Sequence, residues 1–201
     1  FALIPLVARD TTYSWTFLTG SAIYLCCFLA TSVGLKETPS PRDEESQWGA
    51  WREVLRERNL IEPISDAIDS GKPFLGICLG LQLLFTTGFE DGEQPGLGIL
   101  EGRVVRFPRR PGFKVPHMGW NQLHLLRRCP LLEGTQEASH VYFVHSYYAI
   151  PEDSEIVAAE SDYDGPFAAC LWRDNVFATQ FHPEKSQHVG LRMLRNFAEL
   201  C

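Results

Sequence analysis

The chain lacks the residue patterns that hold disulfide frameworks and zinc ions. Its six cysteines include no C-x-x-C pair, and Cys26 and Cys27 are adjacent, while the six histidines are scattered along the sequence. Spaced cysteine pairs build disulfide frameworks, and clustered Cys and His residues hold zinc. We therefore expect neither feature, and a reduced, cytoplasmic location is the simpler interpretation.

The sequence also has no long basic segment. Its formal net charge is −7, and the arginine-rich stretches at residues 106–110 and 127–128 are short and interrupted. Nucleic-acid binding needs a dense basic surface, so a nucleic-acid partner is not expected. The 201 residues show no evident internal repeat and are enough for one hydrophobic core.

A glycine-flanked cysteine follows a short apolar run at residues 74–77. The run predicts a buried strand, and Gly76-Ile77-Cys78-Leu79-Gly80 predicts the sharp strand-to-helix turn called a nucleophile elbow, in which the glycines give the turn room. At a helix N-terminus the backbone N–H groups and the helix dipole favour a thiolate. Cys78 is therefore a candidate nucleophile, and the N–H of Leu79 a candidate oxyanion donor.

A histidine and a carboxylate stand about a hundred residues further on. In Phe181-His182-Pro183-Glu184 the proline disfavours a helix, and in an extended segment residues two apart point the same way. Glu184 can therefore hold the imidazole of His182 while that imidazole faces Cys78. A nucleophile, a base and a residue that orients the base together indicate covalent acyl-transfer chemistry.

These motifs resemble the class I glutamine amidotransferases, whose triad is Cys, His and Glu in this order and spacing. More narrowly, the chain resembles the glutaminase subunit of imidazole glycerol phosphate synthase of histidine biosynthesis. Four segments carry this resemblance: residues 76–85 (GICLGLQLLF), 115–121 (VPHMGWN), 141–148 (VYFVHSYY) and 180–186 (QFHPEKS).

The resemblance implies an enzyme that hydrolyses glutamine to glutamate and ammonia. Cys78 would be the nucleophile, His182 the base and Glu184 the residue that orients the imidazole. No metal and no organic cofactor is implied. In the family, ammonia passes through a channel to a cyclase subunit with a (βα)8 barrel, so a heterodimer with that partner is expected.

Further site residues follow from the same resemblance, each with an ordinary structural alternative. Substrate-binding positions are implied at Leu79, Gln82, His145, Ser146 and Tyr147, and partner-interface positions at Trp120, Asn121 and Lys185. The alternatives are a polar residue at a helix start for Gln82, plain sheet residues at 145–147, core and turn at 120–121, and a solvated lysine at 185.

Hydrophobic periodicity predicts an α/β fold, with a mixed sheet, helices on both faces and the flavodoxin-like core of the class I amidotransferases. One helix face combines Trp51, Val54, Leu55 and Ile61, and a second helix follows Pro63. A helix is expected at 79–85 and another at 186–200. Strands are expected at 74–77, 102–107, 141–148, 156–159, 167–172 and 176–180.

The amidotransferase domain is expected to span residues 49–201, after an atypical segment at 1–48. Members of the family resembled here begin with a strand ending in Asp-Tyr-Gly-x-Gly-Asn, and later carry a Pro-Gly-x-Gly-x-Phe-Gly loop that supplies the second oxyanion donor. In this chain residues 43–49 stand in the place of that loop, and Gly49 alone matches. One hypothesis is that residues 1–47 do not derive from the ordinary reading frame.

Two other interpretations follow from the atypical segment. The chain could be a catalytically impaired or non-catalytic subunit of the same complex, because the oxyanion-loop glycines are missing. Residues 11–35 carry no charged side chain and are long enough to span a bilayer, so a membrane-tethered amidase-like domain is a third interpretation. A misplaced or buried segment is preferred over a membrane span, because Thr, Ser and Gly are frequent there.

Overall fold

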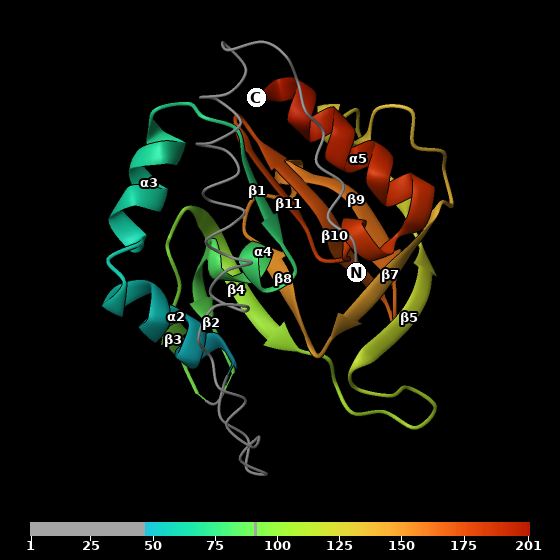
Figure 1. Ribbon diagram of the computed structural model, residues 1–201. Coiled ribbons are helices and arrows are strands. Elements are labelled where there is room, and N and C mark those ends of the chain that lie inside the picture. Colours follow the sequence, from blue (N-terminus) through green and yellow to red (C-terminus); the bar gives the residue numbers. More distant parts are fainter. Residues whose placement is uncertain (1–46, 91) are drawn as a thin grey trace, which may run out of the picture. The chain divides into compact units, whose positions relative to one another are not determined.

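The computed structural model describes residues 47–90 and 92–201 (Figure 1). The apolar run at 11–35 and the segment compared with the family's opening strand lie outside the described residues. The helices are α2 (Gln47–Glu57), α3 (Ile61–Asp69), α4 (Leu79–Leu83) and α5 (Gln187–Leu200), with short 3-10 turns η1 (Pro130–Leu132), η2 (Ser154–Ile156) and η3 (Pro183–Lys185). In the part of the chain that is described, no helix is long and apolar enough to cross a membrane.

The largest sheet joins the strand before the elbow to strands from the end of the chain. Its order is β1 (Phe74–Ile77), β11 (Val176–Thr179), β10 (Pro166–Arg173), β9 (Val157–Asp162) and β6 (His124–Leu125). β1 and β11 pair in parallel, and the other neighbours are antiparallel, so the sheet is mixed as the sequence predicts.

Two hydrophobic cores lie on the two faces of this sheet. Successive side chains of a strand point to opposite faces, and in β11 Val176 and Ala178 belong to one core while Phe177 belongs to the other. The first core takes in side chains of α2, α3 and α4, and the second takes in Met193 of α5. Figure 1 shows α3 and α5 on opposite sides of β1 and β11. The predicted helices on both faces are confirmed.

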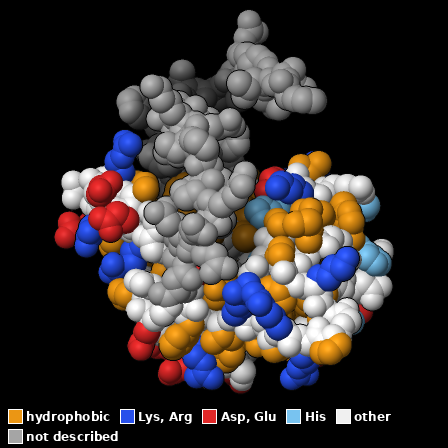
Figure 2. Space-filling view, turned by 90° about the horizontal axis from the view of Figure 1, so that it is seen from below, with side chains coloured by type: hydrophobic (Ala, Val, Ile, Leu, Met, Phe, Trp, Pro, Cys, Tyr) orange, Lys and Arg blue, Asp and Glu red, His pale blue; other side chains and the backbone are white. Residues whose placement is uncertain are grey.

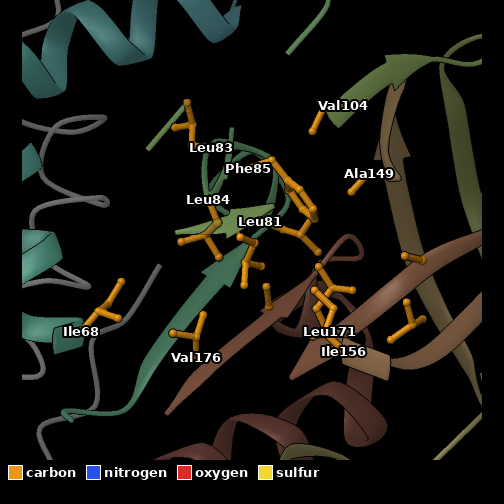
Figure 3. Packing of buried hydrophobic residues seen from close by; sticks show 14 of the residues in the cluster. Ile68, Leu81, Leu83, Leu84, Phe85, Val104, Ala149, Ile156, Leu171 and Val176 are labelled. Atoms are coloured by element: carbon orange, nitrogen blue, oxygen red, sulfur yellow. The ribbon is translucent and has the colours of Figure 1, made fainter. Parts of the chain in front are cut away.

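The first core surrounds the helix that follows the elbow. Figure 3 shows Leu81 and Leu84 between Ile68 of α3 and the strands that carry Val104 and Leu171. Leu81 and Leu84 are fully buried, and Trp48 of α2 is 1% exposed in the same cluster. Trp48 thus packs into the core although it lies one residue before the domain start predicted at residue 49. That domain boundary stays a prediction. Burial of these large apolar side chains holds the elbow rigidly against the sheet.

Two smaller sheets complete the described fold. One has the order β3 (Gln94–Pro95), β2 (Phe85–Gly88), β4 (Leu100–Arg106) and β8 (Tyr147–Pro151). The other pairs β5 (His117–Gln122) with β7 (His140–His145) in antiparallel register. Figure 2 shows one face of the molecule, on which hydrophobic side chains are numerous and Lys and Arg side chains stand at several separate places.

The structure corrects four sequence expectations. The helix predicted at 79–85 ends at Leu83, and Phe85 begins β2, because an apolar run does not distinguish a buried helix from a buried strand. The strand predicted at 141–148 is interrupted at Ser146, and its halves pair with different strands, β5 and β4. Ile61 begins α3 instead of extending the face of α2.

The fourth correction concerns Trp120 and Asn121, for which core and turn were the structural alternatives. Both residues lie in β5, a strand that contains Gly119 at φ +135°, a backbone conformation that residues with a Cβ rarely adopt. Trp120 is therefore a strand residue, and with 47% of its surface exposed it is not a core residue.

Candidate active site

Cys78 lies at the tip of a strained turn between β1 and α4. Its φ of +53° and ψ of −107° fall outside the regions that a residue with a Cβ ordinarily adopts. Such backbone strain costs about 1–3 kcal/mol and is concentrated at functional sites. A Cβ on Gly76 would come within 2.8 Å of the Gly80 carbonyl oxygen, so a glycine at 76 lets the helix turn back over the strand.

Gly80 does not serve the same purpose. A Cβ at Gly80 would meet no heavy atom within 4 Å among the described residues, and its φ is not in the left-handed region. The expectation that both glycines make room for the turn is therefore correct for Gly76 and wrong for Gly80. Within the described part of the chain, the space beside Gly80 is open on the side where its side chain would project.

The parallel pairing of β1 with β11 brings the distant histidine segment to Cys78. Ile77 lies opposite Thr179, and the Cys78 N–H donates a hydrogen bond of 2.7 Å to the Thr179 carbonyl. His182 follows β11 by three residues. Cys78 is half-buried, and its Sγ lies 3.9 Å from the Val144 carbonyl oxygen of β7. Cys78 thus lies where β1, β7 and β11 meet.

His182 and Glu184 form a short, directed contact. His182 Nδ1 lies 2.7 Å from Glu184 Oε1, so Nδ1–H donates to the carboxylate and Nε2 is left for Cys78. His182 itself is extended, but Glu184 lies in the 3-10 turn η3, which begins at Pro183. The contact between the two side chains is as expected, whereas the fully extended conformation expected for the segment is wrong.

The electrostatics of this pair favour a charged imidazole. Burial lowers the pKa of His182, but hydrogen bonds to Cys78 and Glu184, together with their negative charges, outweigh burial and raise that pKa to about 9. Burial raises the pKa of Glu184, yet the hydrogen bond from His182 leaves it below its usual value. With its side chain 19% exposed, His182 therefore can hold the proton that Cys78 gives up.

A buried serine fastens the histidine segment to β7. The Ser186 hydroxyl, fully buried, donates to the His182 carbonyl at 2.7 Å and accepts from the Tyr142 N–H at 3.0 Å. The His182 N–H donates to the Tyr142 carbonyl at 2.9 Å. These bonds fix the backbone that carries the imidazole. Sequence reasoning did not single out Ser186; its position at the start of the helix predicted at 186–200 was the available signal.

Two buried glutamines connect Cys78 to β8. Gln180, fully buried, directs Nε2 at Cys78 Sγ over 3.8 Å. Gln82 Nε2 donates to Gln180 Oε1 at 3.1 Å and to the Tyr147 carbonyl at 2.8 Å. Both N–H groups of Gln82 are therefore used within the protein. Sequence reasoning did not single out Gln180, because a polar residue at the end of a strand gives no sign of which side chain it will meet.

Two buried histidines extend this set of contacts to β5. His145 Nδ1 lies 2.8 Å from the Tyr147 carbonyl oxygen, and His145 Nε2 lies 3.1 Å from His117 Nδ1. His117 Nε2 lies 3.4 Å from Asn121 Nδ2. Burial lowers the pKa of His117 to about 4 and that of His145 to about 3, so both rings are neutral near pH 7. His117, too, was not singled out from the sequence.

The sequence profile of the family described as class-I glutamine amidotransferase matches residues 52–200. The chain belongs to this family. Cys78, His182 and Glu184 all lie within the part of this chain that the family profile matches.

Relatives with high identity are named as subunits of one enzyme of this family. Imidazole glycerol phosphate synthase subunit HisH of Syntrophotalea carbinolica is 54% identical over 160 residues, covering 76% of this chain and 78% of the relative. The protein of the same name from Desulfitobacterium hafniense (strain DCB-2) is 56% identical over 146 residues, covering 73% and 68%. Both resemblances stated from the sequence, to the family and to this glutaminase, are confirmed.

Solved structures show the fold independently of close sequence similarity. A crystal structure of a glutamine amidotransferase superposes with a TM-score of 0.54 at 21% identity and covers 74% of this chain and 71% of its own. A protein from Thermoplasma acidophilum, described as part of a GMP synthase, gives a TM-score of 0.51 at 22% identity, covering 74% and 67%. The predicted class I amidotransferase fold is therefore confirmed.

The remaining predicted site residues lie in two places. Leu79 is the first residue of α4, where helix geometry leaves the N–H without an intrahelical acceptor. The Ser146 carbonyl accepts from the Phe107 N–H at the break between β7 and β8. Trp120 and Lys185 are exposed on β5 and η3, and the Trp120 ring contacts the Tyr142 ring edge-on, with centroids 5.9 Å apart.

Two further observations concern what the described part of the site holds. Among residues 47–90 and 92–201, no three His, Cys, Asp or Glu side chains form a group that could hold a metal ion. Gly49, compared with the family's glycine loop, lies in the first turn of α2. Gln47 and Trp48, from the same comparison, also lie in α2, and residues 43–46 lie outside the described residues.

Proposed function

We propose that Cys78, His182 and Glu184 are the catalytic triad with which this amidotransferase hydrolyses glutamine to glutamate and ammonia. The observation that carries the proposal is the elbow: a strained cysteine beside an imidazole that a carboxylate holds at 2.7 Å. The chain is a glutaminase subunit of the imidazole glycerol phosphate synthase type, as its relatives at 54–56% identity indicate.

The reaction proceeds in two steps at Cys78. Sγ gives its proton to His182 Nε2 and attacks the side-chain amide carbonyl of glutamine, and the N–H of Leu79 donates to the developing oxyanion. His182 then protonates the leaving nitrogen, so that ammonia departs and a thioester remains. Water, deprotonated by His182, hydrolyses the thioester and releases glutamate. Glu184 keeps Nδ1–H oriented throughout, which leaves Nε2 for both proton transfers.

The test is ammonia release from glutamine, with a cognate cyclase and its nucleotide ligand present. We expect Cys78→Ala to abolish release while partner binding persists, because the substitution removes only the sulfur atom. Cys201→Ala, which removes an exposed thiol at the chain end, is the matched control and should retain activity. Near wild-type release by Cys78→Ala would refute the assignment of the nucleophile. No release by the wild-type chain, with the complex intact, would favour the impaired form of the protein instead.

We also propose that β5 and η3 carry the surface for the cyclase, a (βα)8 barrel that receives the ammonia in a heterodimer. Met118 and Trp120 alternate outward on β5, with 63% and 47% of their surfaces exposed. Exposed aromatic side chains often contribute a large share of the binding energy of an interface. Lys185, which directly follows Glu184 in the sequence, adds a positive charge to this surface.

This surface is tested by measuring the dissociation constant of the complex. Trp120→Ala should weaken binding by about 30-fold, the effect of an interface centre of about 2 kcal/mol. Phe89→Ala, which truncates an aromatic residue of similar exposure beside the four-stranded sheet, is the control. Equal dissociation constants for wild type and Trp120→Ala would contradict the proposed surface. Cell fractionation would test the cytoplasmic location that we expect for the complex.

A further inference from the structure

The amide of Gln180 faces the sulfur of Cys78, and nothing in the triad chemistry accounts for it. Gln180 is fully buried at the end of β11, two residues before His182. Its Nε2 lies 3.8 Å from Cys78 Sγ, within the range of a hydrogen bond to sulfur. An N–H aimed at sulfur stabilises the thiolate more than the thiol.

The orientation of this amide follows from its neighbours. A carbonyl oxygen only accepts hydrogen bonds, so the Gln82 atom 2.8 Å from the Tyr147 carbonyl must be the amide nitrogen. That nitrogen also faces the Gln180 side chain at 3.1 Å, so the atom of Gln180 that meets it must be the oxygen. The Gln180 nitrogen is then left for Cys78 Sγ, and the opposite orientation would bring two N–H groups together.

The same reasoning assigns the two buried histidines. The Tyr147 carbonyl accepts from His145 Nδ1–H. In the neutral ring, His145 Nε2 therefore carries no proton, and this nitrogen accepts from His117 Nδ1–H. His117 Nε2 is then bare and accepts from the Asn121 side chain. A second proton on His145 would place two donors face to face over 3.1 Å, and a second proton on His117 would do so over 3.4 Å, against Asn121 Nδ2.

Asn121, at the other end of this series of hydrogen bonds, is also fixed in orientation. Asn121 Oδ1 accepts from the Gln122 N–H at 2.8 Å, and Asn121 Nδ2 donates to the Asp162 carbonyl at 2.7 Å. The Asn121 amide therefore has one orientation, in which Nδ2 faces His117. Starting from Asn121 or from Tyr147 gives the same donors and acceptors throughout, which is the mark of a fully satisfied polar network.

We propose that Gln180 is a positioning residue for the Cys78 nucleophile. Its amide is held in the one orientation that donates to Sγ by the hydrogen bond from Gln82, whose own orientation is fixed by the Tyr147 carbonyl. The inference rests on the proposed function, in which Cys78 is the nucleophile. Gln180 keeps the thiolate in place between β7 and β11 and touches sulfur, whereas the imidazole of His182 moves the proton.

The first experiment measures alkylation of Cys78 by iodoacetamide in the full-length chain, as a function of pH, with the modified peptide quantified by mass spectrometry. Gln180→Met keeps the length of the side chain and removes the amide, and Gln180→Glu replaces the donor by an acceptor. In both variants the midpoint of the alkylation rate should move to higher pH, by about half a unit to one unit for Met and further for Glu. Gln136→Glu adds the same charge at an exposed position and should leave the midpoint unchanged.

Glutaminase kinetics in the presence of the cyclase provide a second measurement on the same variants. Because Gln180 touches sulfur, kcat should fall about tenfold while KM stays within about twofold. An unchanged alkylation midpoint in folded Gln180 variants would overturn the inference. If Cys78→Ala abolishes ammonia release while that midpoint stays unchanged, only this inference fails; if Cys78→Ala remains active, the proposed function fails first.

The hydrogen-bond chain can be tested without any variant. Long-range ¹H–¹⁵N correlation spectra of the wild-type chain report which imidazole nitrogen carries the proton. We expect neutral Nδ1–H tautomers at both His117 and His145 near pH 7. An Nε2–H tautomer at His145 would leave the Tyr147 carbonyl without its ring donor and would overturn the hydrogen-bond assignment of the two rings, whereas the orientation of Gln180 is tested by the alkylation.

Discussion

Replacing Cys78 by glycine is expected to stabilise the protein relative to replacing it by alanine. Both variants lack the sulfur, so the comparison isolates the Cβ of a residue at φ +53° and ψ −107°. The strain of such a backbone is worth about 1–3 kcal/mol, and glycine carries almost none of it. Against this, glycine loses about 0.5–1 kcal/mol more conformational entropy on folding than alanine.

The net expectation is that Cys78→Gly unfolds with a free energy about 1 kcal/mol higher than Cys78→Ala. For a chain of this length the midpoint of thermal unfolding should then rise by about 2–4 °C. Urea unfolding followed by circular dichroism measures the difference, provided that the slope with denaturant is the same in both variants.

The control is the same exchange at an ordinary helical position. Ala198→Gly, at an exposed site of α5, should lower the free energy of unfolding by about 1 kcal/mol. Opposite signs at positions 78 and 198 would support the account of the elbow. If Cys78→Gly is less stable than Cys78→Ala by a similar amount, the backbone at position 78 is not strained, and the reasoning fails.

Three further predictions concern the site and its surroundings. The pKa of His182, about 9 in the wild type, should fall in Cys78→Ala because the bond and the charge of Cys78 are lost; an unchanged NMR titration would contradict this. Gly76→Ala should lower the free energy of unfolding by about 2 kcal/mol or more, since its Cβ would lie 2.8 Å from the backbone oxygen of Gly80; calorimetry showing no loss would contradict the close approach. His145, with a pKa lowered to about 3, binds a proton more readily when unfolded, so as pH falls from 6.5 toward 3 it should remove about 1.4 kcal/mol of stability per pH unit. His145→Gln should show a shallower loss of stability in acid, and an equally steep loss would exclude this residue as the cause.

The parts of the site that depend on local sequence could be predicted. A glycine two residues before a cysteine, after an apolar strand, specifies the elbow through backbone sterics alone. His182 and Glu184 are two residues apart, so their contact needs no knowledge of the remaining fold. The pairing of these two segments came from their resemblance to a family, and the parallel register of β1 with β11 provides its physical basis.

Features that depend on contacts between distant segments could not be predicted. Residues 141–148 have one continuous strand pattern, yet the chain changes partners at Ser146 because β4 and β5 lie on different sides of the break. A turn was the alternative at residues 120–121, because the sequence does not show that Gly119 adopts φ +135° within a strand. Gln180 and His117 are defined by the side chains that they meet, which come from β5, β7 and α4.

The pairing of β1 with β11 also determines when the molecule acquires its chemistry. Cys78 and Gln180 are 102 positions apart, and among the described strands of its sheet β11 comes last in the sequence. During synthesis, a growing polypeptide that has only just passed α4 carries the cysteine but neither the strand that positions it nor His182. Closing so long a loop costs conformational entropy before the contact can offset it. A growing chain that still lacks β11 and η3 therefore holds Cys78 without the amide of Gln180 and the imidazole of His182.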